Sequence, residues 1–579
     1  MTTIPICHAL VLLLAAGAAC AQVPVVDDAG RATRVQAQLS EIDKLYAELA
    51  AREHLPALVY GVVLDGKLVH QRALGLANVE DNIPASSTTR FRIASMTKSF
   101  TALAILKLRD QGKLRLDDPV AMYLPELAKV PLPTADSPPL SLRMLMTMTT
   151  GLPEDNPWGD RQMALSNHAL AKLVAGGLSF SNAPGQEFEY SNLGYMMLGK
   201  VVSKVAGMRF QDYITREILL PLGMRDTSWD YTTIPAAQLA RGYLWNGKGW
   251  EREPMLRDGD AAAMGGLITT MQDFARYVAF HLDAWPARDG ADSGPVRRST
   301  VRAMHTPQAF SAFDAQATLV DRVTPNPNTS FYGYGMTWTR DSRGTVMVGH
   351  SGGLPGFGSN YRFAPHHGIG VIAFSNLRYG RVYKPTAAVL KDVIERAGLS
   401  ARAVATSAIL ARRQPQVLRL IQSWDEALGR DITADNFFLD RSRADWITHA
   451  GTRVASIGKI VSVGALVPDN RLRGAFPIVG EQGTLTVAFT LTPEKEPRMQ
   501  DLTIEVAAPP PVEVLVREGG YVAMGRQFAT VDELFKMLSE RGVKKITMKR
   551  PADGYYKEVG ALIYRAQRLN VELLFPGPE

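Results

Sequence analysis

The sequence places strand-like segments at two widely separated positions, on either side of a long helical stretch that ends near residue 330. These segments are 57–64 and 67–71 near the start, and 345–350 and 368–374 far along the chain. Asp65-Gly66, between the first two, is typical of a two-residue hairpin turn. We therefore expect one antiparallel sheet that the returning chain completes, with an inserted helical subdomain and a closing helix at 385–397. This arrangement defines an α/β fold of the α+β type.

A Ser-x-x-Lys sequence, Ser95 to Lys98, opens the first long helical segment. Apolar residues recur at helical spacing as far as Arg109, and Gly112 follows as a stop signal. Residues three apart share a helix face, so the Ser95 hydroxyl and the Lys98 amine are expected within reach of each other. A lysine kept neutral by burial can take the proton of a serine nucleophile. The same four residues also fit an N-capping serine followed by a solvated lysine, so the motif alone does not establish a site.

Several further stretches accompany this motif in a consistent order. They are 91–98, 112–120, 184–192 with its Tyr-x-Asn, 265–270 and 350–353. With this combination, residues 35–400 resemble the serine β-lactamase, penicillin-binding protein and esterase family, in its class C and D-aminopeptidase-like branch. The resemblance implies a β-lactamase/DD-peptidase-like antiparallel sheet flanked by helices, and hydrolysis through an acyl-enzyme.

The resemblance also implies a role for each matched position. Ser95 would be the nucleophile, and Lys98 and Tyr190 would share the proton transfers; the sequence leaves open which of the two is the base. Asn192 would hold Lys98 or a substrate carbonyl. The backbone N–H groups of Ser95 and Gly353 would form the oxyanion hole. The predicted substrate-binding positions are Asn192, His350, Ser351 and Gly352.

Two positions depart from the family pattern. His350 stands where many β-lactamases and carboxypeptidases have a lysine, and a histidine near neutral pH is only partly charged. This departure weakens the case for penicillin-like substrates, which carry a carboxylate, and leaves esters, amides and peptides with a free amino terminus. Met148 stands where the family commonly has a histidine, and we expect that position to be structural.

Histidine spacing and charge narrow the function further. Only His366 and His367 are adjacent among the ten histidines, and we expect that pair at a hairpin tip. No His-x-His or His-Glu-x-x-His sequence occurs, so no metal and no other cofactor is expected. The net charge is +7, but no basic run with interleaved aromatic residues indicates nucleic acid. The expected partner is a small ester, amide or peptide substrate, with a cell-wall peptide as a further candidate.

The first 21 residues have no charged side chains. They contain a short apolar run at 9–18, followed by a small-x-small sequence at 19–21. This pattern predicts a signal peptide, residues 1–21, and export to the periplasm. Its removal would take away both cysteines, Cys7 and Cys20, so no disulfide framework is expected. A second interpretation keeps Cys20 as a lipidated N-terminus, although the residues before it fit a lipoprotein signal poorly.

Two small α+β domains are expected beyond residue 400. Residues 405–508 combine a helical stretch, broken near Pro415, with a group of strands, and loosely resemble cystatin-like or nuclear-transport-factor-like modules. A proline-rich linker leads to a β-β-α-β-α-β segment at 512–579, in which Thr530 and Glu533 predict a capping box. That segment resembles the periplasmic domain of biopolymer-transport small subunits, which implies docking or self-association.

Overall fold

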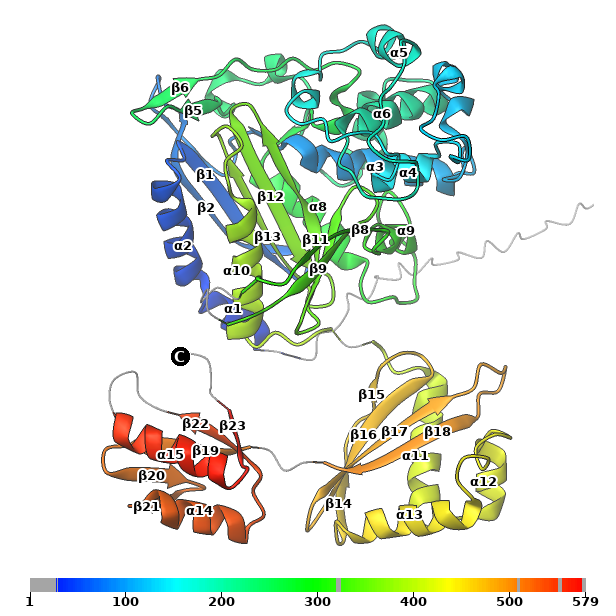
Figure 1. The fold of residues 1–579 in the computed structure, drawn as a ribbon, viewed down its shortest axis with the longest axis vertical. Coiled ribbons are helices and arrows are strands. Elements are labelled where there is room, and N and C mark those ends of the chain that lie inside the picture. The colour runs from blue at the N-terminus through cyan, green and yellow to red at the C-terminus, as the bar shows by residue number, and fades with distance from the viewer. Residues whose placement is uncertain are drawn as a thin grey trace, which may run out of the picture. The chain divides into compact units, whose positions relative to one another are not determined.

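The computed structural model describes residues 28, 30–318, 324–402, 404–507, 511–549 and 555–574. The chain forms two compact units, Met1–Arg402 and Ala403–Glu579, and each is described by itself (Figure 1). The predicted signal peptide, with Cys7 and Cys20, lies outside the described residues. Within the described part of the chain, no helix is both long and apolar enough to cross a membrane.

An antiparallel sheet lies at the centre of the first unit, with nine strands among the described residues in the order β3-β2-β1-β13-β12-β11-β10-β9-β8. The strands are β1 (Ala57–Leu64), β2 (Lys67–Asn78), β3 (Ile83–Pro84), β8 (Ala309–Asp314), β9 (Asn328–Tyr332), β10 (Thr337–Asp341), β11 (Val346–Leu354), β12 (Phe357–Ala364) and β13 (Ile369–Ser375). β1 pairs with β13 from Leu58–Ser375 to Leu64–Ile369. The returning chain thus completes the sheet beside its first strand, as predicted.

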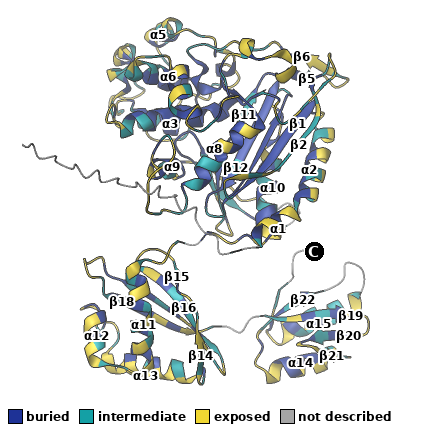
Figure 2. Ribbon diagram, turned by 180° about the vertical axis from the view of Figure 1, so that it is seen from behind, coloured by how far each residue is buried: buried dark blue, intermediate teal, exposed yellow. Residues whose placement is uncertain are grey.

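Helices cover both faces of this sheet. They are α2 (Leu39–Arg52) and α10 (Tyr383–Arg396) on one face, and α3 (Thr97–Asp110) and α8 (Met271–Asp283) on the other. Successive side chains of β1 point to opposite faces: Leu58 and Tyr60 pack with α2 and α10, whereas Val59 and Val63 join the core of α3 and α8. Burial on both faces explains the continuous apolar run of β1, and Figure 2 shows the central strands buried.

A helical subdomain lies at one end of the sheet, where α3, α4, α5 and α6 gather (Figure 1). The remaining elements of the first unit are α1 (Arg31–Gln36), α4 (Leu142–Thr147), α5 (Asn167–Ala175), α6 (Asn192–Ala206), α7 (Phe210–Ile214) and α9 (Arg298–Met304), with the short pairs β4 (Phe91–Arg92) with β7 (Ile268–Thr269) and β5 (Tyr243–Trp245) with β6 (Trp250–Arg252). α6 begins after Ser191, whose hydroxyl accepts from the Gly194 N–H, and ends at Gly207 in a left-handed conformation. The helical subdomain places α6, which begins with Asn192, next to α3.

The second unit begins with helices that pack on an antiparallel sheet. Its elements are α11 (Ala408–Gln422), α12 (Glu426–Ile432), α13 (Arg443–Ala455), β14 (Ile460–Val463), β15 (Val467–Pro468), β16 (Arg473–Gly480), β17 (Thr484–Leu491) and β18 (Met499–Val506). The expected break near Pro415 is wrong, because α11 runs through that proline. An internal proline costs a helix about 3 kcal/mol, and the burial of Leu410, Val417 and Leu420 in one core offsets that cost.

A separate sheet follows in the order β21-β20-β19-β22-β23, with its own apolar core. Its elements are β19 (Val512–Arg517), β20 (Gly520–Ala523), β21 (Arg526–Phe528), α14 (Val531–Glu540), β22 (Lys545–Lys549), α15 (Tyr556–Arg568) and β23 (Glu572–Leu574). The capping box of Thr530 and Glu533 is confirmed at the start of α14. The short strand β21 is an addition to the predicted β-β-α-β-α-β order.

Candidate active site

Ser95 lies in a 3-10 turn, Ala94–Met96, directly before α3. The preceding residue, Ala94, has a φ of 48°, a conformation that is unfavourable for residues other than glycine. Another segment of the same chain holds the turn in place, since the Ile93 N–H donates to the Leu267 carbonyl at 3.1 Å and β4 pairs with β7. The Leu267 N–H in turn donates to the Thr97 hydroxyl at 3.1 Å. The stretch 265–270 therefore fixes the backbone on both sides of Ser95.

Lys98 is completely buried and its Nζ lies within hydrogen-bond distance of three oxygen atoms. These are Ser95 Oγ at 3.0 Å, Asn192 Oδ1 at 2.7 Å and the Met264 carbonyl at 2.7 Å. A neutral amine has two N–H groups, and the two carbonyl oxygens can only accept, so both N–H groups are taken by Asn192 and Met264. The lone pair of neutral Lys98 is then directed at the Ser95 hydroxyl. This geometry suits proton abstraction from Ser95.

Burial also separates the proton affinities of Lys98 and Tyr190. Loss of solvation lowers the pKa of Lys98 to about 7, with a partial opposing effect from Asp160 and Asp155. Burial raises the pKa of the Tyr190 phenol well above its usual range, and a hydrogen bond between Tyr190 and Ser95 offsets part of that rise. The Lys98 Nζ lies 5.0 Å from the centre of the Tyr190 ring. Near neutral pH the site thus holds a lysine that is partly uncharged and a tyrosine that keeps its proton.

Asn192, the last residue of the Tyr-x-Asn motif, is the first residue of α6. Its amide Nδ2 donates to Asn156 Oδ1 at 2.6 Å, which leaves Oδ1 facing Lys98. The Asp155 carboxylate accepts from the backbone N–H groups of Asn192 and Leu193, each at 2.8 Å, and so caps the helix. Asp155 and Asn156, which the sequence did not single out, orient the amide that holds Lys98.

The glycines of β11 lie against the turn that carries Ser95. The pairing of β10 with β11 ends at Gly349, whereas β12 pairs with β11 as far as Leu354. A Cβ on Gly352 would lie 2.2 Å from the Ile93 carbonyl oxygen, and one on Gly353 would lie 2.7 Å from the Tyr379 ring. These glycines are thus required by the protein's own packing, and the substrate-binding role of Gly352 stays a prediction. The oxyanion role of the Gly353 and Ser95 N–H groups stays a prediction.

Replacement of Gly352 by alanine is expected to destabilise the first unit. Because the new Cβ would overlap backbone, we expect Gly352→Ala to lower the free energy of unfolding by about 3 kcal/mol. Gly249→Ala is the matched control, since a Cβ at Gly249 meets no atom within 4 Å. Urea unfolding followed by tryptophan fluorescence measures both variants. A Gly352→Ala midpoint equal to that of wild type would contradict this packing.

His350 is 3% exposed and lies on β11 beside the site. Its Nδ1 faces the Ser351 carbonyl, which can only accept, so Nδ1 carries the proton and Nε2 accepts from the Tyr332 hydroxyl at 2.9 Å. Burial, with Lys98 nearby, lowers the pKa of His350 to about 3. The expectation of a partly charged histidine is therefore wrong, because the ring is neutral. A hydrogen bond from this ring to a substrate would require one of these two bonds to break, and the predicted substrate-binding role of His350 stays a prediction. Ser351, also predicted to bind substrate, is exposed.

Two further residues near Lys98 and Gly353, Asp160 and Tyr379, were not recognised in the sequence. Asp160 is 2% exposed and follows Gly159 in a short turn, Gly159–Arg161, where a Cβ on Gly159 would lie 2.7 Å from Asn192 Cβ. Burial raises the pKa of Asp160, and Lys98 opposes that rise. The Tyr379 hydroxyl donates to Asp160 Oδ2 at 2.9 Å. Asp160 is 65 residues from Ser95 in sequence and Tyr379 is further still, so no local pattern connects them with the motif.

Two other predicted features are placed by the structure. Met148 is buried at the end of α4 in a left-handed conformation, and its carbonyl accepts from the Glu189 N–H at 2.9 Å, which fits a structural position. His366 and His367 lie in the turn between β12 and β13, as expected. In the described ranges, no group of three or more His, Cys, Asp or Glu side chains is placed to hold a metal ion.

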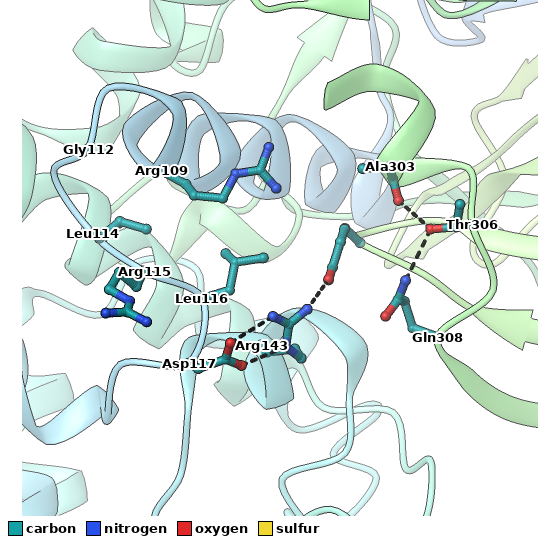
Figure 3. Close-up of a pocket in the computed structure, with 11 residues that line it drawn as sticks. Arg109, Gly112, Leu114, Arg115, Leu116, Asp117, Arg143, Ala303, Thr306 and Gln308 are labelled. Carbon is teal, nitrogen blue, oxygen red and sulfur yellow. Dashed lines mark hydrogen bonds and ion pairs between the residues drawn. The ribbon is translucent and has the colours of Figure 1, made fainter. Parts of the chain in front are cut away.

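A hollow of about 440 Å³ lies beside Arg109 and Gly112, at the C-terminal end of α3 (Figure 3). Ser95 lies before the start of that helix. Its lining residues are Arg109, Gly112, Leu114, Arg115, Leu116, Asp117, Arg143, Ala303, Thr306, Gln308 and Tyr334. Arg143 pairs with Asp117 through two nitrogens and also bonds the Tyr334 hydroxyl. None of the predicted site residues lines this hollow, so it is separate from the Ser95 site.

Comparisons with known proteins agree with this arrangement. A family profile described as Beta-lactamase matches residues 42–394, which is most of the first unit and more than half of the chain. The chain belongs to the beta-lactamase family, whose fold also includes penicillin-binding proteins. The octameric penicillin-binding protein homologue from Pyrococcus abyssi shares the fold, with a TM-score of 0.51 and 21% identity over 84% of this chain and 94% of that one.

The curated relatives are similar over part of their length. Protein flp of Staphylococcus aureus (strain N315) is 29% identical over 343 residues, which cover 58% of this chain and 63% of that protein. Beta-lactamase-like protein 2 of Dictyostelium discoideum is 30% identical over 259 residues, which cover 44% of this chain and 47% of that protein. The chain thus spans less than two thirds of these relatives.

The pKa of Lys98 predicts the pH dependence of any acylation at Ser95. Because Lys98 must be neutral to accept the proton and its pKa is about 7, we expect kcat/KM to fall about tenfold per pH unit below 7 and to level off above it. Initial rates of p-nitrophenyl ester hydrolysis between pH 5 and 9, corrected for spontaneous hydrolysis, measure the profile. A rate that is constant from pH 5.5 to 8 would contradict the assignment.

Proposed function

We propose that this protein is an exported serine hydrolase that forms an acyl-enzyme on Ser95 with ester or amide substrates, as an esterase or a D-aminopeptidase- or carboxypeptidase-like enzyme. The observation that carries the proposal is the position of the Lys98 Nζ, 3.0 Å from Ser95 Oγ, with its two other partners both carbonyl oxygens. A solvated lysine after a capping serine would not be completely buried within hydrogen-bond distance of three oxygen atoms.

In the proposed reaction, Ser95 Oγ attacks the substrate carbonyl carbon while its proton passes to neutral Lys98. The negative charge that develops on the carbonyl oxygen is stabilised by the N–H groups of Ser95 and Gly353. The proton then reaches the leaving oxygen or nitrogen through Tyr190, whose high pKa keeps it a donor at neutral pH. Water attacks the resulting ester of Ser95, its proton returns through the same groups, and the free acid and the serine hydroxyl are restored.

The charges around Ser95 favour esters and amides over penicillin-like substrates. A penicillin carries a carboxylate, and the residue at the third motif, His350, is neutral and engaged by Tyr332 and Ser351. The buried carboxylate of Asp160 adds negative charge near Lys98. A β-lactamase proper is therefore the second candidate. A catalytically silent binding protein is the third candidate, and the position of Lys98 beside Ser95 argues against it.

Two activity probes separate these candidates. We expect a fluorophosphonate to label the full-length protein and to leave Ser95→Ala unlabelled, and a fluorescent penicillin to label neither. Labelling of wild type by both probes would favour a β-lactamase or penicillin-binding activity. No labelling of the folded protein by either probe would favour the silent binding protein and would overturn the proposed hydrolase.

The termini carry two further proposals. We propose export through residues 1–21, which mass spectrometry of the mature N-terminus tests; an intact Met1 or a lipidated Cys20 would contradict cleavage after Ala21.

We also propose that residues 512–579 mediate docking or self-association. Light scattering of the full-length protein and of a chain ending at residue 508 tests the second proposal, and the same oligomeric state for both would contradict self-association.

A further inference from the structure

We propose that Tyr379 determines which acyl groups reach Ser95, by forming a fixed aromatic wall beside Gly353 that admits short acyl groups and excludes long ones. This inference rests on the proposed acyl-enzyme function and names a specificity-determining residue for it. Its basis is the placement of the Tyr379 backbone, the conformation of that residue and the contacts of its hydroxyl.

The backbone at Tyr379 lies directly over the glycines of β11 and β12. The Tyr379 N–H donates to the Leu354 carbonyl at 3.2 Å, next to Gly353. Gly353 pairs with Gly358 across the two strands, and a Cβ on Gly358 would lie 2.2 Å from the Gly380 carbonyl oxygen. The absence of side chains at Gly353, Gly358 and Gly380 thus allows the segment that carries Tyr379 to pack onto the strand pair, and the ring occupies the space beside Gly353.

The conformation of Tyr379 is unusual for an aromatic residue. Its φ is 49°, in the left-handed region where glycine is favoured and a bulky side chain is disfavoured. Glycine would fit this backbone at lower cost. A tyrosine at such a position, 37% exposed and next to the predicted oxyanion donor, is consistent with a functional demand for the ring.

The Tyr379 hydroxyl is anchored by two residues of the helical subdomain. It donates to Asp160 Oδ2 at 2.9 Å and also shares a hydrogen bond with Arg161. Asp160 comes from the helical subdomain and Tyr379 from the loop after β13, so the side chain joins the two parts of the first unit. With its backbone packed on glycines and its hydroxyl held by a buried carboxylate, the ring is not free to swing away.

The position of this ring sets the room for the substrate. If the Gly353 N–H binds the carbonyl oxygen, the acyl substituent on the same carbon must pass close to the Tyr379 ring. A long chain would have to displace the ring and break the bond to Asp160, whereas an acetyl group would not reach it. Short acyl esters are therefore the expected substrates.

The test compares acyl chain length in variants of the full-length protein. Tyr379→Gly removes the ring and suits the left-handed backbone, Tyr379→Phe keeps the ring without its anchor, and Tyr383→Ala is the control, since Tyr383 is an exposed tyrosine nearby at the start of α10. The readouts are kcat/KM for p-nitrophenyl acetate and octanoate, and the rates at which a methyl and an octyl fluorophosphonate label Ser95.

We expect Tyr379→Gly to raise the octanoate-to-acetate ratio of kcat/KM at least tenfold, Tyr379→Phe to raise it about threefold, and Tyr383→Ala to leave it unchanged. The octyl-to-methyl labelling ratio should follow the same order. Unchanged ratios in Tyr379→Gly, or in Tyr379→Phe if the glycine variant does not fold, would overturn the inference while the proposed function stands. Absence of both ester turnover and Ser95 labelling in wild type would overturn the two together.

Discussion

Lys98→Met is expected to lower kcat/KM for ester hydrolysis by at least about 10³-fold, because it removes the group that accepts the Ser95 proton. Methionine has a similar length and no charge, so it suits a completely buried position. Asn192 Oδ1 and the Met264 carbonyl each lose a donor, so the free energy of unfolding should also fall, by about 1–3 kcal/mol. Ester hydrolysis rates and circular dichroism melting curves measure the two effects.

The matched control for Lys98→Met is Lys107→Met, on the same helix. Lys107 pairs with Glu217 at 3.0 Å and lies away from Ser95, so its replacement should change kcat/KM less than twofold. A Lys98→Met protein that keeps a tenth or more of the wild-type rate would contradict the role of Lys98 as the base.

Tyr190→Phe is expected to lower kcat by about 10²-fold or more with a smaller effect on KM, because the hydroxyl is needed for proton transfer to the leaving group. Substrates with a poor leaving group, such as amides, should lose more than p-nitrophenyl esters, whose leaving group departs without a proton. Steady-state kinetics with one substrate of each kind measure the difference.

Tyr213→Phe is the control for Tyr190→Phe. Tyr213 is buried, and among the described residues its hydroxyl has no hydrogen-bond partner, so the change should alter neither kcat nor KM appreciably. Equal losses for amides and p-nitrophenyl esters in Tyr190→Phe would contradict a role of the hydroxyl in protonating the leaving group.

The sequence predicted those parts of the fold that follow from local patterns. Local turn residues and apolar spacing were enough to predict the hairpin at Asp65-Gly66, the helix after Ser95 and the returning strands. β12 was missed because it contains buried polar residues, Ser359 and Asn360, whose hydrogen bonds go to the Ile93 and His350 carbonyls. A strand that satisfies polar side chains through tertiary contacts does not show an apolar pattern.

The site residues that are close in sequence, or that belong to a motif, could also be predicted. Ser95 and Lys98 are close because they are one helical turn apart, and Asn192 was found through a motif. Asp155, Asn156 and Asp160 act only because the segment after Pro153 folds back onto the start of α6. Sequence spacing says nothing about such a contact. The protonation state of His350 likewise depends on burial, which the motif does not indicate.

The central claim is that Ser95 forms a covalent acyl-enzyme with the help of Lys98. The most direct test is acid quenching of the full-length protein during turnover of p-nitrophenyl acetate, followed by intact-mass and peptide-mass analysis. We predict that the wild-type protein gains the mass of one acetyl group on the peptide containing Ser95, that Lys98→Met accumulates it far more slowly, and that Ser95→Ala does not gain it. Hydrolysis without an adduct, or an adduct that persists in Ser95→Ala at the wild-type rate, would contradict the claim.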